Sequence, residues 1–340
     1  MGLSSSEVVR VMVPDGSAWE DVLGFSGKLA ELPEAGAYVI DFADVGFTTP
    51  GWMAVIGDSL NAFRIRRPDA KRRADNYKRP GLGYAAAAGF FHYFGVDWGQ
   101  KPGALNSTDA FVPLTVKSVD DLRARAAIDM VHYGDLIQIE AERLVAVLTR
   151  LEKGDVFDTL AYSIRELVRN VVEHSEAEHY SFAAQWWPAA GRAEMVVSDT
   201  GIGLTQSLRL NPRLNVADDA TALRLAVQPG VTSRGRSGRS NDVWRNTGYG
   251  LYMTHGICSA AGSFTLISGR SATVADNAGE RFVQCDATGT TVVMRLDTAG
   301  LGDLTTRLAE LRDIAGRASI KPSVASLSKR VVYKTGVSND

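Results

Sequence analysis

The sequence predicts an α/β protein built from two domains, and three observations lead to this prediction. The chain has 340 residues, enough for two domains with separate cores. Strand and helix patterns alternate over the first hundred residues. Two long helical patterns then precede a series of strands and further helices. We therefore expect an N-terminal domain at 1–100, a linker at 101–117, a larger domain at 118–318 and a polar tail at 319–340.

Composition and charge are those of a globular protein in a reducing compartment. Hydrophobic residues make up 45% of the chain and charged residues 22%. The net charge of -2 provides no general attraction to nucleic acid or to a membrane. Cys258 and Cys285 are far apart and lack metal-site spacing, which argues against a disulfide scaffold or a zinc site. With no signal-peptide pattern and no apolar run of membrane-spanning length, we expect a cytoplasmic protein.

The N-terminal segments alternate between the hydrophobic patterns of strands and of helices. Residues 7–13 have the pattern of a strand and residues 37–42 that of a buried strand, and residues 19–32 have the pattern of a helix between them. A turn at 48–51 then leads into another helix. Pro50 suits the first turn of that helix, where its missing N–H group is not needed.

This turn resembles the one in the STAS family, the sulfate-transporter and anti-sigma-antagonist domains, where a Ser or Thr at a helix N-terminus is a phosphorylation switch. Thr49 matches the phosphorylated position and Gly51 the glycine, whereas Thr48 stands where the family usually has Asp. The apolar segment 82–97 is similar to the end of such domains. The resemblance implies a small α/β domain. Thr49 has two interpretations at this point, a phosphorylation site or a helix-capping hydroxyl.

A basic segment at 64–81 contains an aromatic residue and is offset by only two acids, Asp69 and Asp75. Such a segment can contact nucleic acid or an acidic partner, or can form a solvated loop and helix face. The near-neutral net charge favours the second interpretation, so we do not expect a nucleic-acid partner. The segment 98–108, rich in Gly, Pro and small polar residues, begins the predicted linker.

The second domain is organised around a predicted amphipathic helix at 160–175, which follows a helical region at 118–153. Its apolar residues recur at helical spacing. Glu166, Asn170 and His174 follow one another at intervals of four, which places them along one stripe of the helix. A carboxylate, an amide and an imidazole in this arrangement suit a metal-bound phosphate, and they also suit a solvated helix surface.

Two glycine motifs follow this helix. A predicted hairpin at 179–187 and 193–199 leads directly into Asp199, Gly201 and Gly203, which would let a flat ligand approach the backbone beside a hydrogen-bond acceptor. A second motif then opens a helix near 249–262, where free N–H groups suit phosphate. Its residues are Thr247, Gly248, Tyr249, Gly250 and Leu251. Later, Thr290 enters a final strand.

The order of these motifs closely resembles the GHKL superfamily of ATPases, which includes gyrase, heat-shock chaperones, histidine kinases and MutL. The resemblance covers roughly residues 118–300. It implies a two-layer α/β sandwich with a mixed, largely antiparallel sheet and helices on one face. It also implies that Asn170 coordinates Mg²⁺ at the ATP phosphates and that Glu166 is the general base.

The remaining residue assignments also come from this resemblance. Asp199 would accept a hydrogen bond from the adenine amino group, with Thr290 supporting it and the two nearby glycines lining the adenine pocket. Residues 247–251 would lie at the phosphates, with His174 nearby. The segment between the motifs would be a lid over ATP, with a helical part at 218–230 and a basic part at 231–246. Arg245 is the arginine of that part nearest the second motif.

The use made of ATP stays open at this stage. One hypothesis is a serine/threonine kinase of the anti-sigma type, or a sensor derived from one, because GHKL kinases and STAS proteins are partners in bacterial partner-switching pathways. The alternative is a conformational switch that binds or slowly hydrolyses ATP without phosphorylating protein. Either hypothesis implies a regulatory protein partner. A homodimer is possible under either hypothesis, and the oligomeric state stays open.

Overall fold

The computed structural model describes residues 8–233, 248–297 and 304–317. Its N-terminal part is a three-stranded parallel sheet in the order β1-β2-β3. The strands are β1 (Val8–Met12), β2 (Ala37–Asp41) and β3 (Lys71–Asp75). The chain crosses between them through α1 (Trp19–Ala30) and α2 (Pro50–Arg66), because parallel neighbours need a long connection. The short helices η1 (Pro80–Leu82), α3 (Gly83–Ala88) and α4 (Phe90–Tyr93) follow.

The larger part is a five-stranded antiparallel sheet in the order β4-β5-β6-β8-β7. Its strands are β4 (Phe111–Ser118), β5 (His179–Trp187), β6 (Arg192–Asp199), β7 (Gly262–Asp276) and β8 (Gly279–Asp297). Its helices are α5 (Val119–Ile128), α6 (Tyr133–Thr149), α7 (Asp155–His174), η2 (Pro188–Ala190), α8 (Gly203–Arg209), α9 (Asp219–Ala226), α10 (Gly250–Ala260) and α11 (Leu304–Arg317).

The helix expected at 160–175 is present as α7, and it begins earlier, at Asp155. Its apolar stripe is buried as the periodicity predicts, with Leu160 and Ile164 fully enclosed and Val168 nearly so. These side chains join one hydrophobic core with residues of α6, α10, α11 and one face of the five-stranded sheet.

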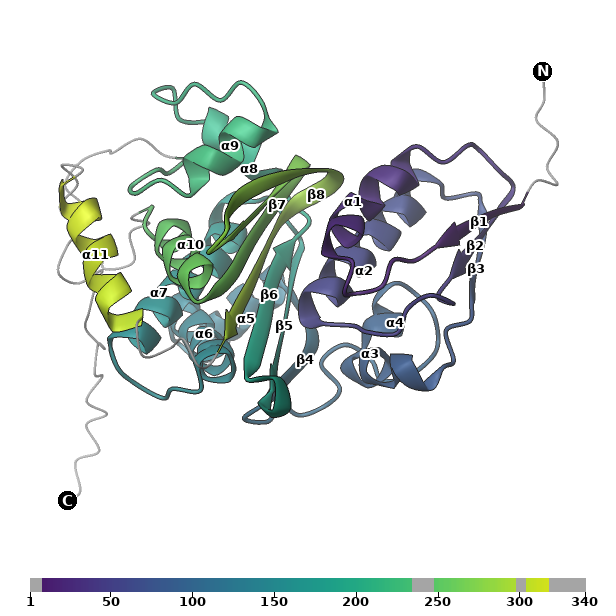
Figure 1. The fold of residues 1–340 in the computed structure, drawn as a ribbon, viewed down its shortest axis with the longest axis horizontal. Helices are drawn as coiled ribbons and strands as arrows, with labels where there is room; N and C mark the ends of the chain where they lie inside the picture. The colour runs from purple at the N-terminus through teal and green to yellow at the C-terminus, as the bar shows by residue number, and fades with distance from the viewer. Residues whose placement is uncertain (1–7, 234–247, 298–303, 318–340) are drawn as a thin grey trace.

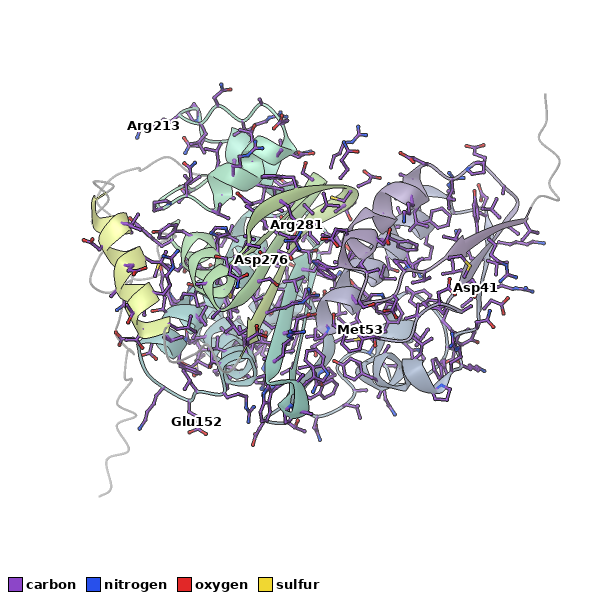
Figure 2. The ribbon with its side chains drawn as sticks, viewed as in Figure 1. Asp41, Met53, Glu152, Arg213, Asp276 and Arg281 are labelled. Carbon is purple, nitrogen blue, oxygen red and sulfur yellow. The ribbon has the colours of Figure 1, made fainter. Side chains whose placement is uncertain are left out.

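The other face of this sheet packs against α1 and α2, so the molecule has four layers (Figure 1). Along β6, Met195 and Val197 belong to the core under α7, whereas Val196 belongs to the core under α1 and α2. This alternation follows from the period of two in a strand. Met53 of α2 lies where that helix meets the sheet (Figure 2).

The hairpin of β7 and β8 extends beyond the sheet and covers α1 (Figure 1). Hydrogen bonds join it to the N-terminal helices. The Asp286 N–H group donates to Ser26 Oγ at 2.9 Å, and Trp19 Nε1 donates to Thr265 Oγ1 at 3.2 Å. The two parts of the chain therefore share a core and a set of polar contacts.

The structure corrects several sequence-based expectations. Residues 111–117 of the expected linker belong to β4, which pairs with β5. The five-stranded sheet is antiparallel throughout instead of mixed, and helices cover both of its faces instead of one. The basic segment contains β3, whose exposed side chains hide the strand pattern. The sequences of edge strands such as β3 and β4 have a weak strand pattern, since these strands form only when a partner strand is beside them.

None of the helices that the structure describes is long and apolar enough to cross a membrane. The expected tail at 319–340 lies outside the described residues.

Candidate functional site

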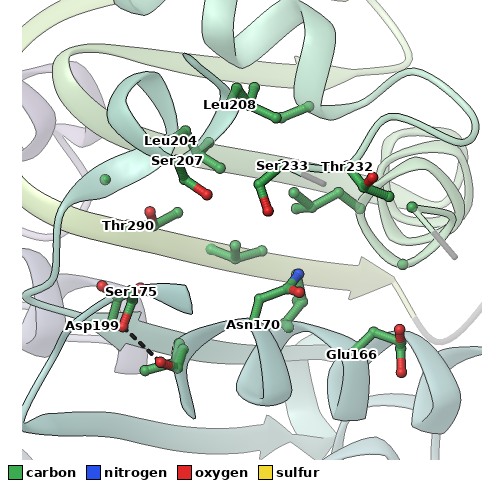
Figure 3. Close-up of a pocket in the computed structure, with 18 of the residues that line it drawn as sticks. Glu166, Asn170, Ser175, Asp199, Leu204, Ser207, Leu208, Thr232, Ser233 and Thr290 are labelled. Atoms are coloured by element: carbon green, nitrogen blue, oxygen red, sulfur yellow. Dashed lines mark hydrogen bonds between the residues drawn. The ribbon is translucent and has the colours of Figure 1, made fainter. Parts of the chain in front are cut away.

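A pocket with an empty volume of about 910 Å³, including its mouth, opens between α7, β6, β8, α8 and the start of α10 (Figure 3). Among the residues expected in a site, the pocket is lined by Glu166, Asn170, Asp199, Gly203, Gly248, Gly250, Leu251 and Thr290. Segments spread over 125 positions, from 166 to 290, therefore converge on one cavity.

Glu166 and Asn170 enter the pocket from α7 (Figure 3). Glu166 is only 2% exposed, and burial raises the pKa of its carboxyl group, although the neighbouring Arg169 and Arg165 oppose this effect. Arg169 donates to Glu166 Oε1 at 3.2 Å. Glu166 Oε2 has no hydrogen-bond partner among the described residues. One oxygen of this carboxylate is thus held by a cation, while the other can still accept a proton.

Asp199 lies at the opposite end of the pocket from Glu166 (Figure 3). Burial raises the pKa of its carboxyl group to about 7, and the charge of Asp58 adds to that rise. Hydrogen bonds from the N–H groups of Gly201 and Thr290 oppose the rise, the first at 2.8 Å to Oδ1. A buried carboxylate with this environment presents a fixed acceptor to a ligand.

The glycines after Asp199 are required by close packing. A Cβ atom on Gly201 would overlap the carbonyl oxygen of Ser175, at the end of α7. Gly203 has φ +74° and Gly289 has φ +70°, in the left-handed region that favours glycine. A Cβ atom on Gly289 would overlap the Asp199 carbonyl oxygen. Gly201 itself lines a second pocket that adjoins the first at Gly203.

The second glycine motif places the start of α10 against α7. A Cβ atom on Gly250 would lie 3.1 Å from Glu166 Cβ, so any larger residue would require the two helices to shift apart by a few tenths of an ångström. Gly248 has φ +70° and packs closely against the segment at 230–232. Tyr249, the N-cap residue of α10, makes no side-chain cap hydrogen bond. The N–H groups of the first turn are therefore not capped by this side chain, and Gly250 and Leu251 of that turn line the pocket.

Besides Gly201, four predicted residues lie elsewhere than expected or are not fully described by the structure. The Tyr249 side chain is buried in the hydrophobic core and is not part of the pocket wall. Thr247 and Arg245 lie outside the described residues, as do the other arginines in the basic part of the expected lid. His174 is the last residue of α7, and the structure does not describe its side chain.

Several pocket residues were not predicted from the sequence. Hydroxyl groups come from Ser175, Ser207, Thr232 and Ser233, and apolar walls come from Val197, Leu204, Leu208 and Val292. Single serines and leucines carry no motif, so only the fold could identify them. Ser268 acts from outside this wall, since its Oγ accepts from Leu204 N–H at 2.9 Å and donates to the Gly289 carbonyl at 2.8 Å.

The structure also bears on the two interpretations of Thr49. Its hydroxyl accepts a hydrogen bond from the Trp52 N–H group at 3.2 Å and caps α2. The residue is 4% exposed. Thr49 is therefore a buried helix cap, remote from the pocket. In the basic segment, Lys71, Arg72 and Arg73 are exposed on the edge strand β3.

Within the described ranges, no cluster of three or more His, Cys, Asp or Glu side chains could hold a metal ion. A metal in the pocket would thus take most of its ligands from a bound molecule and water. No protein-family model matches the chain, and no curated protein matches it.

Proposed function

We propose that the chain binds Mg–ATP in the pocket between α7, β6, β8 and α10, as a protein of GHKL type. One observation carries the proposal: Asp199 lies at one end of a pocket whose other end holds Glu166, Asn170 and the start of α10. Adenine recognition and phosphate recognition both have suitable groups at these separate ends. The order of motifs in the sequence supports the same arrangement.

The Asp199 end suits an adenine base. A fixed carboxylate oxygen can accept a hydrogen bond from an exocyclic amino group. The aliphatic side chains of Val197, Leu204 and Val292 supply apolar surface for a flat ring. The close approach of the backbone at Gly201 and Gly203 leaves room for the ring edge.

The Glu166 end suits a magnesium-bound triphosphate. No Lys or Arg is among the described residues that line the pocket, so negative phosphates need another source of positive charge. The N-terminus of α10 supplies N–H groups and the positive end of the helix dipole. Asn170 and phosphate oxygens form the hard donor set that Mg²⁺ prefers, and the ion would neutralise charge during phosphoryl transfer.

Glu166 would act as general base toward a hydroxyl group or water. Its raised pKa makes the carboxylate a stronger proton acceptor, and its contact with Arg169 orients the carboxylate. We propose a cytoplasmic serine/threonine kinase of the anti-sigma type, or a sensor derived from one. Because Thr49 is buried, the phosphorylated hydroxyl would belong to a regulatory protein partner.

An ATP-gated switch is the second candidate, and the packing of α1 and α2 on the back of the pocket sheet favours it. A change in β6 or β8 on nucleotide binding would reach the N-terminal helices directly. In this case ATP would be bound or slowly hydrolysed, and no protein would be phosphorylated.

The test begins with calorimetric titration of purified protein with Mg–ATP. Asp199→Asn should weaken binding at least about tenfold, whereas Glu166→Ala should spare binding and abolish turnover. Glu142→Gln, on the half-buried surface of α6, is a matched control that should change neither. Absence of ATP binding by the wild-type protein contradicts the proposal.

Incubation with γ-labelled ATP separates the two candidates. Label on a serine or threonine of a partner protein supports the kinase, and phosphate released only to water supports the switch. Full turnover by Glu166→Ala would show that the base assignment is wrong.

A further inference from the structure

A chain of buried and partly buried hydrogen bonds connects α2 and α4 with the five-stranded sheet. Ser198 Oγ donates to Asp58 Oδ2 at 2.6 Å, and the Tyr93 hydroxyl donates to the other carboxylate oxygen, Oδ1. Ser198 Oγ and Thr291 Oγ1 lie 2.7 Å apart. The chain therefore joins two N-terminal elements to two neighbouring strands, β6 and β8.

The direction of this chain follows from the chemistry of a carboxylate. An ionised carboxylate only accepts hydrogen bonds, so both hydroxyls that contact Asp58 must donate to it. The single proton of Ser198 is then used, and Thr291 must donate to Ser198. Asp58 thus sets the orientation of every hydroxyl in the chain.

The chain lies directly behind the pocket. Ser198 pairs with Thr291 across the two strands, and the next pair along is Asp199 with Thr290. Because side chains alternate along a strand, the first pair faces α2 and the second pair faces the pocket. Asp199 and Thr290 both line the pocket, whereas Ser198 and Thr291 are both buried on the other face.

A further feature indicates that Asp58 affects Asp199. The charge of Asp58 contributes to the raised pKa of Asp199, so the two carboxyl groups interact through the sheet. Asp58 also borders a small cavity with an empty volume of about 350 Å³, lined by α1, α2, β7 and β8.

We propose that Asp58 is a positioning residue for purine recognition, which makes the N-terminal domain part of the nucleotide site. Through Ser198 and Thr291 it fixes the register and orientation of the two strand ends that present Asp199 and Thr290. The Asp199 oxygen is thereby directed at the 6-amino group of adenine. This inference rests on the proposed function. It adds to the nucleotide site a residue that does not itself line the pocket.

The test compares two nucleotides that differ only in this amino group. Binding of Mg–ATP and of Mg–purine riboside triphosphate, which lacks the 6-amino group, is measured by calorimetry. Wild-type protein should prefer ATP by about tenfold, the value of one good hydrogen bond. Asp58→Asn and Ser198→Ala should each lose most of this preference, with ATP affinity falling about tenfold and the analogue changing less than about twofold.

Thr265→Val is the matched control. Thr265 lies on the same face of the sheet and accepts a hydrogen bond from Trp19 of α1, so its loss removes one polar contact between the same two parts of the chain. The preference for ATP should survive this change. Thermal unfolding of each variant confirms that it is folded, and Ser198→Ala provides the test if Asp58→Asn does not fold.

Each remaining outcome decides the question. An unchanged preference in both folded variants overturns the inference, as does an equal loss of affinity for both nucleotides, which a general structural role would cause. Wild-type protein that binds neither nucleotide contradicts the proposed function itself, and the inference fails with it. Wild-type protein that binds both nucleotides equally shows that Asp199 does not read the amino group.

Discussion

Two carboxyl groups on opposite faces of the sheet, Asp58 and Asp199, have raised pKa values. Burial raises the pKa of Asp58 to about 6, against the opposing hydrogen bonds from Ser198 and Tyr93. Burial raises the pKa of Asp199 to about 7. In the unfolded chain both groups would titrate near 3.8, so folding takes up protons between these values.

The first prediction concerns this proton uptake. A folded-state pKa above the unfolded value contributes stability that is complete below pH 3.8 and is lost as the pH rises through about 6. Wild-type protein should therefore become less stable between pH 5 and pH 8, by an amount of which Asp58 contributes about 1.4 kcal/mol. Urea unfolding at the two pH values measures this loss.

Asp58→Asn should reduce the same loss, because the amide does not titrate. The groups around Asp58 are Tyr93 from α4 and Ser198 from β6, with Asp286 of β8 across the adjoining cavity and Asp199 on the other face of the sheet. Removal of the Asp58 charge also lowers the pKa of Asp199, which reduces the loss further. An unchanged pH dependence in this variant would contradict the assignment.

A second prediction at the residue scale concerns Thr49. Its hydroxyl caps α2, so Thr49→Ala should lower the free energy of unfolding by about 1 kcal/mol. Thr49→Ser keeps the hydroxyl and should retain most of that free energy. Urea unfolding of both variants measures these two free energies. Label at Thr49 of the folded protein after incubation with γ-labelled ATP would contradict its description as a buried cap.

At the scale of elements, the N-terminus of α2 is attached to the centre of the five-stranded sheet. The Gly51 N–H group in the first turn of α2 donates to Glu194 Oε1 of β6 at 2.6 Å. Arg295 of β8 pairs with the same carboxylate and lies over the ring of Trp19, 4.2 Å from its centroid. A negative charge beside the positive end of a helix dipole stabilises this junction.

The third prediction follows from that junction. Glu194 is 1% exposed, and Glu194→Ala would leave a buried N–H group and a largely buried arginine without their acceptor. We expect a loss of about 3 kcal/mol in the free energy of unfolding. Glu178→Ala, at an exposed position before β5, is the control and should cost less than about 0.5 kcal/mol. Similar values for the two variants would contradict the importance of this contact.

At the scale of the whole molecule, the two parts of the chain share one core. Phe25 and Trp52 from the N-terminal helices belong to the same hydrophobic cluster as Val196, Ile267 and Val293 from the five-stranded sheet. Separation of the parts would expose one full face of that sheet to water. Apolar burial is the dominant favourable term in folding, so the interface couples the stability of the two parts.

The fourth prediction is that the protein unfolds in a single step. Differential scanning calorimetry should give one transition with a calorimetric enthalpy close to the van't Hoff enthalpy. Saturating Mg–ATP should raise the temperature of that transition, since a ligand bound only to the folded state stabilises the whole cooperative unit. Two separate transitions, with only one shifted by the nucleotide, would contradict a shared core.

Elements with strong internal periodicity could be predicted from the sequence. The helix at 160–175 and the strand at 179–187 are present as α7 and β5, because their apolar patterns alone specify which side is buried. The strands β3 and β4 were missed, since their charged or mixed sequences pair only with strands that the tertiary fold brings beside them. The extension of β7 and β8 over α1 depends on the same distant contacts.

For the site, the sequence by itself determined the chemistry: a carboxylate and an amide one helical turn apart, an aspartate at a strand end, and glycines where backbones must approach closely. The spacing of residues on a helix and the conformational freedom of glycine are properties of short segments, so both can be predicted from the sequence. The tertiary structure decided that Glu166, Asn170, Asp199 and Thr290 line one pocket. It also placed Asp58 behind Asp199, because contacts across a sheet depend on which layers pack together and not on distance along the chain.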